Sequence, residues 1–201
     1  MHPLRSLRAV LSHRVNSPGA CTGGHRYRPG CHGNLMQNTD PVFDAVRRRI
    51  NNSRRLAIVG IGDELIPYDR LGMYTAREID QHHQPGVEVF LAGTVPESVT
   101  GPLRRYQPDH VLFFDAADMG ARPGTIAMIE PGQIHASLVS THVLPLPVVM
   151  DYIERESGAG VTLFGIQPDL TSADKDLSDE DMAYLTRNLD QLFQILCERQ
   201  V

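Results

Sequence analysis

Short apolar runs alternate with amphipathic segments from residue 41 to the end of the chain. The apolar runs, typical of buried parallel strands, cover residues 55–62, 86–93, 110–116, 124–131 and 160–168. Segments with helical spacing separate or flank them, over residues 41–52, 70–83, 96–106, 146–157 and 178–196. This alternation predicts an α/β fold: a three-layer sandwich with a mostly parallel sheet of about five strands and helices on both faces.

The first 39 residues depart from this pattern. They are rich in Gly, Pro, Asn and Ser, and they carry five arginines but no acidic residue. We expect residues 1–53 to be a low-complexity, Arg-rich extension: a disordered segment, a transit peptide, or an upstream reading of a gene that starts at Met36. The α/β domain is then expected over residues 54–201. The spacing of Cys21, His25, Cys31 and His32 matches no zinc motif.

Charge and composition exclude several classes of function. The net charge is -5, and the five arginines of residues 1–39 are offset by an acidic remainder of the chain. No basic face for nucleic acid is therefore expected. No apolar run is long enough to insert into a membrane. Three cysteines make no disulfide framework and fit a reducing compartment. We therefore expect a cytoplasmic protein, and a monomer.

Polar side chains follow the predicted strands, where loops of an open α/β sheet converge on one edge. They are Asp63, Glu64, Asp69, Asp115, Asp118, His142, Gln167 and Asp169. Carboxylates and an imidazole at one edge suit zinc, nickel or a similar divalent metal. The same residue types also serve as turn and helix-capping residues, so this pattern alone leaves both interpretations open.

Two other kinds of site find little support in the sequence. The stretch GIGDELIPYDRLG after the first strand lacks the third glycine of a dinucleotide loop and the lysine of a P-loop. The carboxylates of Asp63 and Glu64 in this stretch would repel phosphate. There is also no Gly-x-Ser-x-Gly nucleophile motif, and Cys197 belongs to the pattern of the last helix.

Four motifs in order resemble the maturation endopeptidases of nickel–iron hydrogenases, most closely those of the hydrogenase 3 type. The motifs are VGIGDELIPYDRLG, FFDAADMGARPGTI, STHVLPL and GIQP, and the resemblance covers residues 55–197. It implies an endopeptidase, of a metal-dependent or aspartic type, that removes the C-terminal extension of a nickel-loaded large-subunit precursor. The metal would be nickel carried by that precursor, although another divalent metal is possible in the same site.

The resemblance also implies which residues act. The family's metal-binding and catalytic positions fall on Asp69, Asp115 and His142, and Gly93 and Thr94 fall in a loop that meets the substrate. A metal there can polarise a carbonyl group or lower the pKa of a bound water.

The first loop departs from the family pattern. Asp63 replaces an asparagine, Tyr68 replaces the first acid of an acidic pair, and Arg70 replaces a glycine. An arginine beside a cation-binding carboxylate competes for it unless its side chain points away. An alternative function is therefore a non-catalytic, metal-dependent binding protein on the same scaffold. A third is a general α/β metallohydrolase of small molecules.

Overall fold

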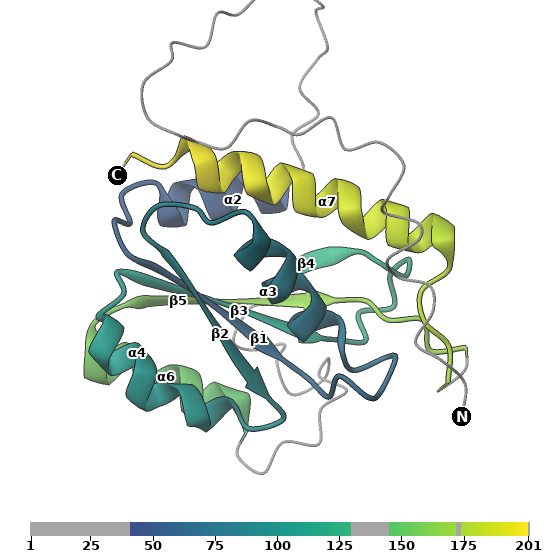
Figure 1. Cartoon of the computed structure of the whole chain (residues 1–201), viewed down its shortest axis with the longest axis horizontal. Helices are drawn as coiled ribbons and strands as arrows, with labels where there is room; N and C mark the ends of the chain where they lie inside the picture. The colour runs from purple at the N-terminus through teal and green to yellow at the C-terminus, as the bar shows by residue number, and fades with distance from the viewer. Residues whose placement is uncertain (1–40, 130–144, 172–173, 201) are drawn as a thin grey trace, which may run out of the picture. The chain divides into compact units, whose positions relative to one another are not determined.

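The computed structural model describes residues 41–129, 145–171 and 174–200 (Figure 1). The elements are α2 (Pro41–Ile50), β1 (Leu56–Ile61), α3 (Leu71–Gln81), β2 (Val87–Gly93), η1 (Pro96–Val99), α4 (Thr100–Tyr106), β3 (His110–Ala116), β4 (Ile126–Ile129), α6 (Leu146–Ser157), β5 (Gly160–Ile166) and α7 (Asp179–Glu198). The strands form one five-stranded sheet in the order β2-β1-β3-β5-β4. The predicted fold class and number of strands are confirmed.

Strand direction follows from the connections. The pairs β1–β2, β1–β3 and β3–β5 are parallel, and a helix lies within each of the described connections that cross between them. The chain between Ala116 and Ile126 contains no helix. It turns at Gly124, where φ is 82°, and β4 then pairs antiparallel with β5.

Alternating side chains of the strands build two cores, one on each face of the sheet. On one face, Ile58 and Phe114 pack against α2, α3 and α7, and Phe114 stacks on Phe164 at 5.1 Å between ring centroids. On the other face, Val59 and Phe113 pack against α4 and α6. Figure 1 shows these two helical layers on opposite sides of the sheet. Each such buried side chain contributes about 1.5–3 kcal/mol through removal of apolar surface from water.

The boundary expected at residue 54 is too late for the described chain. Phe43, Val46 and Ile50 repeat at helical spacing on α2, and all three are buried in the core that α7 also lines. Residues 41–50 are therefore part of the α/β unit, because their apolar face completes its core. The remainder of the predicted extension, residues 1–40, lies outside the described residues, and so do Cys21, His25, Cys31 and His32.

The start of the last helix agrees with the sequence pattern. The hydroxyl of Ser178 accepts a hydrogen bond from the Asp181 N–H at 3.1 Å, which is the predicted N-cap of α7.

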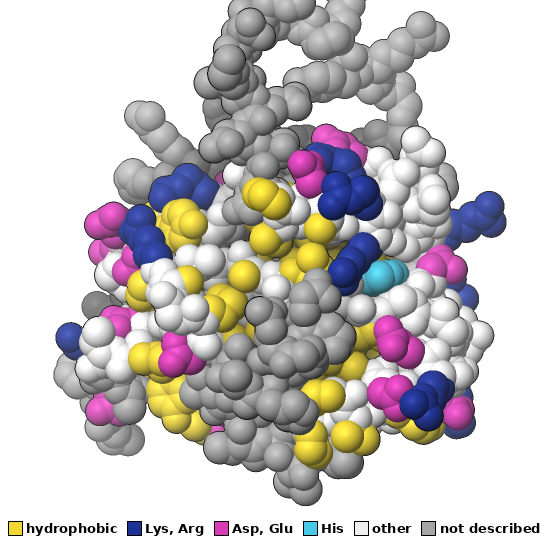
Figure 2. Space-filling view, turned by 180° about the vertical axis from the view of Figure 1, so that it is seen from behind, with side chains coloured by type: hydrophobic (Ala, Val, Ile, Leu, Met, Phe, Trp, Pro, Cys, Tyr) yellow, Lys and Arg dark blue, Asp and Glu magenta, His cyan; other side chains and the backbone are white. Residues whose placement is uncertain are grey.

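None of the described helices combines the length and apolar content needed to cross a membrane. On the face seen in Figure 2, acidic and basic side chains of the described residues lie interspersed, with apolar side chains between them.

Candidate active site

Asp69 is placed by a tight loop after β1. At Gly62 the backbone has φ 126°, and a Cβ there would lie 1.9 Å from the carbonyl oxygen of Asp69. Only glycine fits this position, because any side chain would both strain the backbone and clash with it. The closely folded loop brings the Asp63 N–H to the carboxylate of Asp69, with 2.8 Å between N and Oδ2.

The start of α3 presses this loop against the ends of two strands. A Cβ on Gly72 would lie 2.2 Å from the carbonyl oxygen of Phe114 and 2.4 Å from that of Ile61. The helix can approach the sheet this closely only because residue 72 has no side chain. The loop that carries Asp69 therefore leads directly into a helix start that packs on the carboxyl ends of β1 and β3.

Asp115 comes from the central strand at the same edge. It follows Phe114, which pairs with Gly60 of β1, and it lies opposite Gly165 of β5. Its side chain is fully buried, and Oδ1 lies 2.8 Å from the N–H of Ala116. Asp69, in the loop after β1, and Asp115, near the end of the adjacent strand β3, therefore belong to the same carboxyl edge of the sheet.

The carboxylate of Asp69 is buried, but only one of its two oxygen atoms has a hydrogen-bond partner among the described residues. The residue is 5% exposed, and its Oδ1 atom has no hydrogen-bond partner among the described residues. Burial removes the favourable hydration free energy of a carboxylate oxygen. Attraction to a nearby cation would offset this loss. Carboxylate oxygens such as those of Asp69 and Asp115 are of the type that divalent metals bind.

The third predicted member of the site, His142, lies outside the described residues. Within residues 41–129, 145–171 and 174–200, no group of three or more His, Cys, Asp or Glu side chains is arranged to hold a metal ion. The assignment of Asp69, Asp115 and His142 as a metal-binding and catalytic set therefore stays a prediction.

Gly93 and Thr94 lie beside the first loop. The carbonyl oxygen of Gly93 accepts a hydrogen bond from the Gly62 N–H at 3.0 Å, which ties the end of β2 to the loop that carries Asp69. Gly93 has φ 59°, and the space where its Cβ would lie is open. Thr94 is exposed. This position at the sheet edge suits a contact with substrate, and that role stays a prediction.

Arg70 does not neutralise its neighbour Asp69. Its guanidinium forms an ion pair with Asp176, in the segment that precedes α7. The arginine expected to compete for the Asp69 carboxylate is instead paired with a carboxylate of the segment before α7. Tyr68 is half-buried.

Other acidic candidates make local turn contacts. Asp63 Oδ1 accepts from the Leu65 N–H at 2.9 Å, and Asp118 Oδ1 accepts from the Gly120 N–H at 3.2 Å. Asp169 accepts from the Thr171 N–H at 2.9 Å. Hydrogen bonds from the side chain and backbone of Thr171 lower the pKa of Asp169 below its ordinary value. The turn interpretation of Asp118 and Asp169 is confirmed.

Gln167 makes contacts that the sequence does not reveal. The sequence marks it only as a polar residue after the fifth strand and as part of the GIQP motif. In the structure it is buried and binds the chain segment that follows Asp115. Its partners lie more than 40 positions earlier in the sequence, so no local pattern could have identified them.

Comparisons with known proteins agree on one family. The family model described as hydrogenase maturation protease matches residues 73–194. The chain is 31% identical over 128 residues to a protein of Methanocaldococcus jannaschii provisionally named a hydrogenase maturation protease, covering 60% of this chain and 76% of that protein. It is 31% identical over 111 residues to the hydrogenase 3 maturation protease of Escherichia coli, covering 55% of this chain and 70% of that one.

A solved structure gives the same result. The crystal structure of a nickel–iron hydrogenase maturation protease from Thermococcus kodakarensis superposes with a TM-score of 0.64 at 29% identity. The alignment covers 76% of this chain and 98% of that one.

Proposed function

The chain belongs to the hydrogenase maturation protease family, and from this premise we propose that it removes the C-terminal extension of a nickel-loaded large-subunit precursor at the edge formed by Asp69, Asp115 and His142. Membership makes it an endopeptidase, a hydrolase of peptide bonds that acts in hydrogenase maturation. The metal dependence, the three site residues and the identity of the precursor belong to the proposal.

The observation that carries the proposal is the buried Oδ1 of Asp69, which has no hydrogen-bond partner among the described residues. Holding a carboxylate there is unfavourable unless a positive charge arrives to interact with it. Asp115 lies at the end of the adjacent strand and would supply the second oxygen donor, and His142 the nitrogen donor. In this proposal nickel is part of the substrate. It would therefore contact the two carboxylates only when the precursor binds.

The roles of this chain's residues follow from that arrangement. Asp69 and Asp115 would bind the nickel-bearing part of the precursor and so orient the scissile peptide against the sheet edge. The Asp63 N–H fixes one oxygen of Asp69 and leaves the other for the substrate. A bound divalent metal can polarise a carbonyl group or lower the pKa of a water from about 15.7 towards 7.

The loops around this edge also expose apolar side chains. Leu65 after β1 is 90% exposed, Val95 after β2 is 43% exposed, and Leu170 after β5 is 46% exposed. These side chains, in the loops that follow three different strands, offer apolar contacts to a protein substrate. They support a large partner such as a precursor over a small polar molecule, and hence the protease over the general metallohydrolase.

The test is an incubation with nickel-loaded large-subunit precursor, analysed by mass spectrometry. The wild-type protein should release a discrete C-terminal peptide, and nickel-free precursor should remain uncut. His142→Ala should abolish cleavage, whereas Asp80→Asn, which alters an exposed carboxylate on α3, should leave it unchanged. A wild-type protein that co-purifies with the loaded precursor but leaves it intact would contradict the protease and establish the non-catalytic binding protein.

A further inference from the structure

Gln167 joins the end of β5 to the segment that leaves β3 beyond Asp115. It directly follows Ile166, which pairs with Ala116, and the residue is only 4% exposed. Its backbone N–H donates to Thr125 O at 2.9 Å, and its carbonyl oxygen accepts from the Gly124 N–H at 2.8 Å. These two bonds fix the backbone of Gln167 relative to the second half of the segment.

The side-chain amide of Gln167 holds the first half. Its Oε1 accepts from the N–H groups of Met119 at 2.6 Å and Ala121 at 3.3 Å. Its Nε2 donates to Pro168 O at 3.2 Å and lies 3.4 Å from Oδ1 of Asp118. Because two N–H donors face one end of the amide and two oxygens face the other, a group that both accepts and donates is required here.

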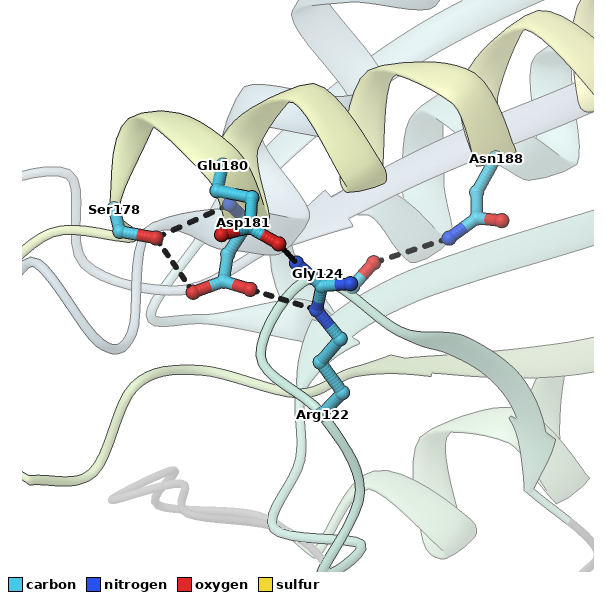
Figure 3. Close-up of polar contacts among 6 residues, drawn as sticks. All are labelled: Arg122, Gly124, Ser178, Glu180, Asp181 and Asn188. Atoms are coloured by element: carbon cyan, nitrogen blue, oxygen red, sulfur yellow. Dashed lines mark hydrogen bonds and ion pairs between the residues drawn. The ribbon is translucent and has the colours of Figure 1, made fainter.

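The far end of the segment is anchored independently to α7 (Figure 3). Arg122 binds Asp181 and Glu180, each at 2.8 Å. Asn188 donates to the carbonyl oxygen of Gly124 at 3.2 Å. With this end fixed, residues 118–121 are held by the Gln167 side chain and by the local bond from the Gly120 N–H to Asp118 Oδ1.

We propose that Gln167 is a positioning residue for the hydrolysis: its amide holds residues 118–121 against the end of β5 and sets the carboxylate of Asp118 at the edge where Asp115 acts. This inference rests on the proposed function. Asp118 is exposed and only three residues beyond Asp115, so a shift of this segment changes the wall of the site next to the reacting peptide. Displacements of about 1 Å at such positions can lower a rate by about 100-fold.

The decisive variant is Gln167→Glu, which keeps the size and the acceptor oxygens but cannot donate when ionised. It would place a second negative charge next to Asp118, and repulsion should move the segment. We expect kcat for cleavage of nickel-loaded precursor to fall about 10- to 100-fold while KM changes less than about twofold. Gln167→Met removes both functions of the amide and should lower kcat at least as much. Gln81→Met, at an exposed glutamine of α3, is the matched control and should retain wild-type kcat and KM.

A pH profile distinguishes positioning from general structural damage. Protonation gives the introduced carboxyl group an O–H donor, so it then resembles the amide. The kcat of Gln167→Glu, relative to wild type at each pH, should therefore recover as the pH is lowered, and that of Gln167→Met should not. Wild-type kcat in both variants, or a Gln167→Glu defect that stays the same at every pH, would overturn the proposal.

A second measurement keeps this test separate from the proposed function. If the wild-type protein does not cut the precursor, the proposed function fails, and amide hydrogen exchange of the full chain then tests the positioning alone. The amides of Met119 and Ala121 should be protected in the wild type and exchange at least about 10-fold faster in Gln167→Met. Equal exchange rates in the two proteins would overturn the role of Gln167 whatever the activity.

Discussion

The amino and carboxyl edges of the sheet differ in how fully their buried polar groups are hydrogen-bonded. At the amino edge, His110 Nε2 lies 2.9 Å from the hydroxyl of Thr162, which also accepts a hydrogen bond from Arg49 at 3.2 Å. Arg199 is buried there and donates to the carbonyl oxygens of Ser53 and Pro85, at 3.1 and 2.8 Å. The Arg199 bonds tie the end of the last helix to the segments that precede β1 and β2.

At the carboxyl edge of the described chain, Gln167 is fully hydrogen-bonded but the buried carboxylate of Asp69 is not. The Oδ1 atom of Asp69 has no hydrogen-bond partner among the described residues, and Leu65, Val95 and Leu170 expose apolar surface. Unsatisfied buried groups and exposed apolar side chains reduce stability, so their presence at one edge indicates surface kept for a partner. The comparison predicts that substitutions at the carboxyl edge alter activity and those at the amino edge alter stability.

The largest effect is expected from Asp69→Asn. The amide oxygen can still accept from the Asp63 N–H, but the negative charge proposed to bind the precursor's nickel is lost. We expect cleavage to fall by at least about 100-fold. The free energy of unfolding should be unchanged or higher, because a buried charge has been removed. Urea unfolding and the mass-spectrometric cleavage assay measure the two effects, and a large loss of stability would contradict the assignment of Asp69 to function.

The reverse pattern is expected from Arg199→Met at the amino edge. The thioether retains much of the apolar stem but leaves the carbonyl oxygens of Ser53 and Pro85 without this donor. We expect the free energy of unfolding to fall by about 3 kcal/mol, with cleavage unchanged below the new unfolding transition. Arg104→Met, at an exposed arginine of α4, should change stability by less than about 0.5 kcal/mol. Equal losses in the two variants would show that the Arg199 contacts contribute nothing specific.

A smaller, pH-dependent effect is expected from His110. Burial, and then the positive charge of Arg49, lower its pKa from 6.5 to about 4. The unfolded chain therefore binds a proton in the range between these two values that the folded chain does not, so stability decreases as the pH falls from about 6.5 towards 4. The difference is about 2 kcal/mol at pH 5 relative to pH 7.5.

The measurement is urea unfolding at several pH values for the wild type and His110→Gln. The variant should lose this part of the pH dependence, whereas His83→Asn, at an exposed histidine, should retain it. The prediction fails if the wild type and His110→Gln have parallel stability profiles between pH 7.5 and pH 5.

The fold was predictable because its signals are local. Each strand is a short apolar run, and the glycines at positions 60, 62 and 72 mark where the chain must approach itself closely. The carboxylates Asp69 and Asp115 could be assigned to one edge because parallel strands end together. The helix at residues 41–50 was also visible as an amphipathic pattern, but its packing on the core was not, because its neighbours in α7 lie at the other end of the sequence.

The contacts that adjust the site were not predictable in this way. Gln167 and Met119 are 48 positions apart, and Arg70 and Asp176 are 106 apart. Nothing in the sequence shows that a neutral amide holds residues 118–121, or that an arginine next to Asp69 is paired elsewhere. Such contacts depend on which loops the folded sheet brings together.

The smallest expected effect tests whether Asp176 keeps Arg70 away from Asp69. Both partners of this ion pair are partly exposed, at 24% and 47%, so the pair itself adds little stability. Asp176→Asn releases the guanidinium, which can then compete with the substrate's nickel for the Asp69 carboxylate. We expect kcat/KM for precursor cleavage to fall about fivefold, equivalent to about 1 kcal/mol. In the background of Arg70→Gly the same substitution should change kcat/KM less than about twofold, since the competing charge is absent. A double-mutant cycle measures this dependence, and equal effects of Asp176→Asn in both backgrounds would show that Asp176 acts on the site without Arg70.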